Sequence, residues 1–139
     1  MQQVLKAAEQ IEALGIAAHV FSITSYTELA IEAESCDRTN RLNPLATPQV
    51  LQVEQLLGGN STPVVAACDY AKSLPKQIAS WLPQNFTTLG TDGFGLSEAR
   101  DTLREHFEVS ALPIVHAAVL ALYKAGDIDR QKLEELSRY

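Results

Sequence analysis

Three short apolar runs, separated by stretches with helical periodicity, constrain the fold of this chain more than any other feature. The runs cover residues 16–23, 62–68 and 86–90, and β-branched, aromatic and small residues dominate them. Such runs are typical of strands buried on both faces, as in a parallel sheet covered by helices. The alternation predicts an α/β fold with a mostly parallel sheet, as a single domain over residues 1–139.

Capping residues and glycines predict where the helices begin and end. The predicted helices are 2–14 before Gly15, Ser25 to about Ala33 with a capping box to Glu28, Thr47–Pro48 to Gly58–Gly59, 70–81 capped by Asp69, Ser97 to about Phe107, an apolar helix from Ser110 to Gly126, and 130–137 capped by Asp129. Residues 34–46 lack periodicity and predict an exposed irregular connection.

Charge and composition exclude several classes of function. Eleven Lys and Arg against seventeen Asp and Glu give a net charge of -6, which has the wrong sign for binding nucleic acid. No apolar run approaches the ~18 residues of a membrane-spanning helix, and the residues after Met1 do not resemble a signal peptide. We therefore expect a cytoplasmic protein with no membrane partner. The two cysteines, Cys36 and Cys68, fit reduced thiols better than a disulfide or a zinc site.

The carboxyl ends of the three predicted strands are the candidate binding edge, because ligands of open α/β sheets bind there. They carry Thr24 and Ser25, Cys68 and Asp69, and the loop Gly90–Gly95. The loop could bind an anion through free amides, with Arg100 or Arg104 adding charge, although its G-x-x-G-x-G spacing matches no phosphate-binding motif. The residues of this possible anion or interface site are Asp69, Thr91, Asp92, Gly93, Arg100 and His106. A purely structural role as turns and caps stays the favoured alternative.

The histidines and cysteines do not form a convincing catalytic set. His19 and His116 lie in apolar segments and are expected in the core or in an interface. His106 shares a charged helix with Arg104, which more often marks a solvated face, and Cys68 could be a reactive thiol at a strand end. We assign no catalytic, cofactor-binding or metal-binding residue from these patterns.

Several segments, taken in order, resemble the carboxyl-terminal domain of the homodimeric bacterial pyruvate dehydrogenases, the decarboxylating first components of their complexes. The resemblance covers nearly the whole chain and rests on residues 20–30, 68–72, 89–95, 97, 100, 103–104, 106–109 and 126–129. It implies a transketolase-like, three-layer α/β/α sandwich. It also implies an enzyme whose thiamine diphosphate and magnesium are held by preceding domains, since the magnesium-binding Gly-Asp-Gly and paired-asparagine pattern is missing here.

The resemblance also implies departures and partners. Ser110 stands where the family usually has Asp, and residues 31–44 fit the family pattern loosely. The first strands of the family domain are lacking, including an inner strand before the first helix, so we expect the isolated chain to self-associate or to be marginally stable.

The expected function is that of a noncatalytic, architectural domain of the decarboxylating enzyme. Its expected partners are the preceding domains, a second copy in a homodimer and the lipoyl acetyltransferase component. The alternatives are a stand-alone module that binds small anions and, as a third, an independent enzyme built on His106 or Cys68.

Overall fold

The computed structural model describes residues 1–58, 62–82 and 86–136. The elements are α1 (Gln2–Ala13), α2 (Tyr26–Leu42), a π-helical turn (Glu54–Gly58), β1 (Val64–Ala71), α3 (Ser73–Lys76), a 3₁₀ turn (Ala79–Trp81), β2 (Phe86–Thr91), α4 (Arg100–His106), α5 (Ala111–Ala125) and α6 (Arg130–Leu136). The strands β1 and β2 pair in parallel, with Val64 opposite Phe86. The α/β class and the parallel pairing are therefore confirmed.

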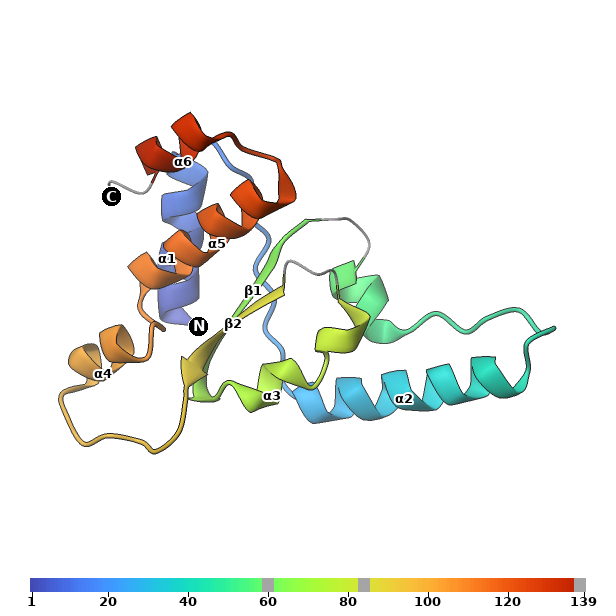
Figure 1. Ribbon diagram of the computed structural model, residues 1–139. Coiled ribbons are helices and arrows are strands. Elements are labelled where there is room, and N and C mark those ends of the chain that lie inside the picture. Colours follow the sequence, from blue (N-terminus) through green and yellow to red (C-terminus); the bar gives the residue numbers. More distant parts are fainter. Residues whose placement is uncertain (59–61, 83–85, 137–139) are drawn as a thin grey trace.

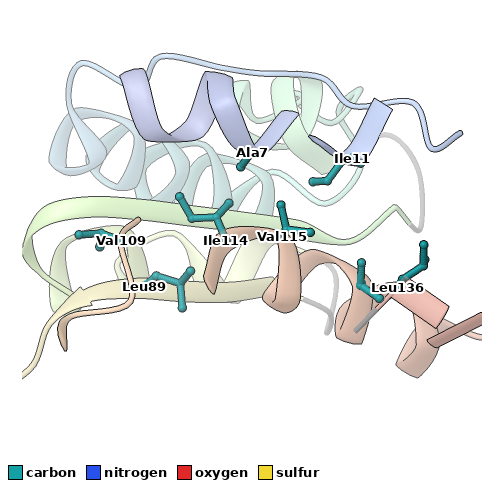
Figure 2. Packing of buried hydrophobic residues seen from close by; sticks show 8 residues of the cluster. Ala7, Ile11, Leu89, Val109, Ile114, Val115 and Leu136 are labelled. Atoms are coloured by element: carbon teal, nitrogen blue, oxygen red, sulfur yellow. The ribbon is translucent and has the colours of Figure 1, made fainter. Parts of the chain in front are cut away.

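The helices form two groups on opposite sides of the strands. Figure 1 shows α1, α5 and α6 on one side and α2 and α3 on the other. The first group encloses a buried cluster to which α1, β2, α5 and α6 contribute, made of Ala7, Ile11, Leu89, Val109, Ile114, Val115, Val119 and Leu136. In Figure 2, Ala7 and Ile11 of α1 point toward Ile114 and Val115 of α5. The second cluster holds Leu29, Ala30, Ala33, Leu51, Val53, Ile78 and Leu82.

Residues 16–23 do not form the strand that their composition predicts. The segment is extended, and it packs on both clusters: Ile16 and Ala18 against the first cluster and Ile23 against the second. His19 and Phe21 point outward and are exposed. Within the described ranges, the backbone of residues 17–24 makes no hydrogen bond. The prediction was wrong because, among the described residues, no strand pairs with the segment.

The region after Ala33 also differs from the prediction. α2 continues to Leu42 instead of giving way to an irregular connection, because Asp37 accepts a 2.6 Å hydrogen bond from Trp81 Nε1 on the 3₁₀ turn.

The helix expected from Thr47 does not form there, and only residues 52–58 turn helical. Asn40 explains this, since its side-chain amide exchanges two hydrogen bonds with the backbone of Gln49, at 2.9 and 2.8 Å, and holds that stretch extended. The expected end of that helix, at Gly59, lies outside the described residues.

Two more predicted helix starts were wrong. Asp69 caps no helix, because β1 runs on to Ala71 and α3 begins only at Ser73. The predicted helix over 70–81 is divided into α3 and the 3₁₀ turn, and Pro75, which cannot donate a backbone hydrogen bond, lies fully buried in α3. Ser97 does not cap α4 either, since Ala99 occupies the N-cap position.

The remaining caps follow the sequence closely. The Glu28 amide donates to Ser25 Oγ at 3.1 Å, and the Lys132 amide donates to Asp129 Oδ1 at 2.7 Å. Gly126 closes α5 in the left-handed conformation with φ of 83°. The predicted end of α6 at position 137 lies outside the described residues.

Ser110 occupies the N-cap position of α5, but its side chain makes no capping hydrogen bond. The amide of Ala111 donates instead to Gln3 Oε1 of α1, at 3.1 Å. The cap of α5 is therefore a tertiary contact between the starts of α1 and α5.

One stretch, Arg100–Ala125, reaches the length and mean hydropathy of a membrane-spanning helix by composition alone. This corrects the expectation that no segment approaches that length. The helix is interrupted between His106 and Ala111, and α5 buries Ile114, Val115 and Val119 in the first cluster. These contacts are those of a core helix in a globular domain.

Candidate functional site at the carboxyl ends of the strands

β1 bulges where it pairs with the carboxyl end of β2. Ala67 pairs with Leu89 and Ala71 with Thr91, so three residues of β1 lie opposite Gly90 alone. A Cβ atom on Gly90 would lie 2.8 Å from the carbonyl oxygen of Tyr70 and 2.9 Å from that of Cys68. Glycine is therefore required here because the backbone of the bulge approaches too closely for any side chain.

Lys72 holds the two strand ends together beyond the bulge. Its amide donates to the Thr91 carbonyl at 3.0 Å, and its ammonium group lies 3.7 Å from Asp92 Oδ2. The Asp92 side chain is 83% exposed, so this ion pair adds little stability. The ammonium group of Lys72 nevertheless already faces a carboxylate.

The start of α2 approaches the same edge through Tyr26. Burial raises the pKa of the Tyr26 phenol, and the nearby Cys68 raises that pKa further. The Cys68 sulfur in turn accepts a hydrogen bond from the Tyr70 amide at 3.3 Å. The tertiary structure thus brings Tyr26, Cys68 and Gly90 to one end of the strands.

The structure gathers only some of the residues predicted for the anion or interface site. Thr91 and Asp92 meet Lys72, whereas Asp69 and Arg100 are exposed and their side chains make no polar contact with the described residues. His106 packs edge-on against Phe107, with ring centroids 4.9 Å apart.

Of the two arginines that the sequence places beside the loop, only Arg104 is paired in the described part of the chain. Arg104 lies 3.5 Å from Asp101, so it, like Lys72, already faces a carboxylate. Two of the three cations near the loop, Lys72 and Arg104, therefore already face carboxylates, and Arg100 points to no carboxylate among the described residues.

The loop after β2 presents apolar side chains instead. Phe94 is 97% exposed, and Leu96 is also exposed. Gly93, with φ of 78°, turns the chain just before Phe94, and a Cβ there would meet nothing within 4 Å. The sequence analysis weighed this loop as a tight turn or an anion cradle and missed the exposure of Phe94, although an aromatic residue between two glycines is a signal for a projecting side chain.

His19 and His116 are both exposed, so of the two expected places the core was wrong, and an interface stays a prediction. His19 is on the outward side of the extended segment. His116 lies on the outer stripe of α5 between Leu112 and Leu120, which are each 44% exposed. Their surroundings look apolar in the sequence, but only the packing decides which side of each element is covered.

The described residues do not supply a set of ligands for a magnesium ion. Over residues 1–58, 62–82 and 86–136, no group of three His, Cys, Asp or Glu side chains gathers to hold a metal ion. The thiol of Cys36 on α2 donates a hydrogen bond to Glu32 at 3.1 Å. This hydrogen bond raises the thiol pKa, and burial and the charges of Glu32 and Asp37 raise that pKa further. We therefore derive no chemical step through the cofactor from this chain.

Comparison with known proteins identifies the family. The profile of the transketolase-like C-terminal domain matches residues 1–110. The chain belongs to that family. It is 42% identical over 133 residues to the C-terminal part of the pyruvate dehydrogenase E1 component of Escherichia coli strain K12, an alignment that covers 94% of this chain and 15% of the relative.

Two other relatives carry the same name. The pyruvate dehydrogenase E1 component of Pseudomonas aeruginosa is 43% identical over 122 residues, covering 87% of this chain and 14% of the relative. That of Buchnera aphidicola from Schizaphis graminum is 45% identical over 121 residues, covering 86% and 13%. The chain thus spans about a seventh of the length of these relatives. Its sequence identity to them confirms the resemblance seen in the sequence.

Proposed function

We propose that this chain serves as the carboxyl-terminal, architectural domain of a thiamine-diphosphate-dependent pyruvate dehydrogenase. In that enzyme it would pack on the preceding cofactor-binding domains and support the homodimer, in the cytoplasm, next to a lipoyl acetyltransferase component. The observation that carries the proposal is the 42% identity to the E. coli relative across 94% of the chain. Decarboxylation of pyruvate and transfer of the acetyl group would then be the work of the whole enzyme.

The surface of the domain supports a packing role. Phe94 and Leu96 project from the loop after β2, and Leu112, Leu120 and Tyr123 form an exposed stripe along α5. Exposed apolar side chains on a loop or along one stripe of a helix can each mark a surface that another domain covers. By contrast, Lys72 and Arg104 face carboxylates, so the alternative of an anion-binding module gains no support from their geometry.

A chimera tests the proposal directly. The matched part of the E. coli relative is replaced by this chain, and pyruvate-dependent turnover and dimerisation are measured. We expect an active dimer. In the same chimera, Phe94→Ser with Leu96→Ser is expected to lower turnover about tenfold or more, because truncating central apolar anchors of an interface costs this much.

Leu45→Ser is the matched control, because Leu45 is also fully exposed but lies in the turn after α2. It should leave turnover unchanged. A correctly folded but inactive chimera would contradict the proposed function, and equal activity of the loop variant and the control would contradict the role of the loop. Saturable binding of phosphate to the isolated chain in calorimetry would favour the anion-binding alternative.

A further inference from the structure

The loop after β2 contains a stretch of backbone without hydrogen bonds. Over the described residues, no amide or carbonyl of residues 92–98 takes part in one, because β2 ends at Thr91 and α4 begins after its N-cap Ala99. Every side chain in this stretch is exposed, and none belongs to either buried cluster. Figure 1 shows it as the open loop between β2 and α4. Exposed loops of this kind are the preferred sites of proteolytic cleavage, since their amides and carbonyls are free to bind a protease.

Phe94 makes this loop suitable for one class of endoprotease. Its side chain is 97% exposed, and the next residue, Gly95, has no side chain to obstruct the bond between them. Chymotrypsin-like proteases hold a large apolar side chain in a hydrophobic slot next to the bond that they cleave. The ring of Phe94 can enter such a slot without losing contacts, because almost all of its surface already faces solvent.

Leu45 is similarly exposed, but its backbone is held on both sides. The Ala46 amide donates a 3.0 Å hydrogen bond to the Asn43 carbonyl, which closes the turn around Leu45. Just beyond this turn, the side chain of Asn40 holds the backbone of Gln49 through two hydrogen bonds. A protease must therefore break these contacts before it can bind the chain at Leu45.

Phe21 is also less accessible than Phe94. It lies in a stretch without backbone hydrogen bonds, but its side chain is only 49% exposed. The same stretch is anchored on either side of Phe21, since Ala18 packs against the first cluster and Ile23 against the second. Backbone freedom and an exposed large apolar side chain thus coincide at Phe94.

Cleavage after Phe94 would leave the core intact. The first buried cluster joins the two pieces, because side chains of α1 and β2, before the loop, pack with side chains of α5 and α6, after it. Figure 2 shows Ala7 and Ile11 of α1 pointing toward α5. The hydrogen bond from the Ala111 amide to Gln3 Oε1 also connects the two pieces.

We propose that the peptide bond between Phe94 and Gly95 is a site of endoproteolytic modification by proteases that accept a large apolar side chain, and that the cleaved chain stays folded. One water molecule is consumed as the C–N bond breaks. Its hydroxyl group stays on the Phe94 carbonyl carbon, the Gly95 nitrogen becomes an amine, and a proton passes from the new carboxyl group to that amine. The proposal concerns the chain itself and does not depend on the proposed enzymatic function.

The test is limited digestion of the folded chain with chymotrypsin, followed over time by mass spectrometry. The first products are expected to be residues 1–94 and 95–139, formed at least about tenfold faster than other fragments, because cleavage elsewhere requires local unfolding. The two pieces should elute together in size-exclusion chromatography. Phe94→Ser should lower cleavage at this bond at least about tenfold, because serine does not fill the hydrophobic slot.

Leu45→Phe is the matched variant, because it places the same side chain at a similarly exposed position whose backbone is held. Cleavage after position 45 should be at least about tenfold slower than after Phe94, and adding Asn40→Ala should accelerate it by removing two hydrogen bonds. Equal rates at both positions in Leu45→Phe, a first cleavage outside residues 92–98, or separation of the two pieces would each overturn the proposal.

Discussion

Gly90 offers the sharpest test of the strand pairing. A methyl group there would lie 2.8 and 2.9 Å from two main-chain carbonyl oxygens of the β1 bulge, closer than a carbon and an oxygen can approach. The bulge cannot move away freely, because the Lys72 amide is bound to the Thr91 carbonyl just beyond it. Gly90→Ala must therefore separate the ends of β1 and β2, and such overpacking costs about 1–3 kcal/mol.

This cost lowers the ratio of folded to unfolded chain about 5- to 140-fold. The assay is urea unfolding followed by the fluorescence of Trp81, the single tryptophan. Gly95→Ala is the control, because a Cβ at Gly95 meets nothing within 4 Å. If Gly90→Ala unfolded at the same urea concentration as Gly95→Ala, the close approach of the bulge to β2 would be refuted.

Two further predictions follow from single contacts. Gln3→Ala removes the side chain that caps α5 and should lower the free energy of unfolding by about 0.5–2 kcal/mol in urea titrations, whereas Gln2→Ala, on the exposed side of α1, should have no effect. In a Cys68→Ser background, alkylation of Cys36 by iodoacetamide should rise with pH only above the ordinary thiol range, because its hydrogen bond to Glu32, burial and the nearby carboxylates keep the thiol protonated. Glu32→Gln should move that profile to lower pH, and an unchanged profile would contradict the assigned cause.

The residues that local chemistry controls were predicted well. Ser25 and Asp129 cap helices because their oxygens accept amides only three residues away, and Gly126 ends α5 because it adopts a positive φ easily. The strands β1 and β2 were also found, since both are short, apolar and rich in strand-forming residues. In each case the decisive interaction lies within a few residues, or in the composition of one segment.

The candidate site was predicted only in part. Its position at the carboxyl ends of the strands follows from the parallel pairing, and Cys68, Gly90 and Asp92 do lie there. The sequence did not reveal that Lys72 would pair with Asp92 or that Phe94 would project into solvent. Both outcomes depend on how the bulge and the following loop turn.

The amino-acid sequence by itself determined the α/β class, the family and the local caps, because these depend on short-range spacing and on ordered strings of residues. Only the tertiary structure decided that α2 reaches Leu42, that Gln49 is held extended and that residues 16–23 stay unpaired. The end of α2 depends on Trp81, 44 residues from Asp37, and the extended backbone of Gln49 depends on Asn40, whereas residues 16–23 stay unpaired because, over the described residues, no strand pairs with them. A segment with strand propensity forms a strand only when another backbone lies within hydrogen-bonding distance, and no local sequence pattern shows whether one does.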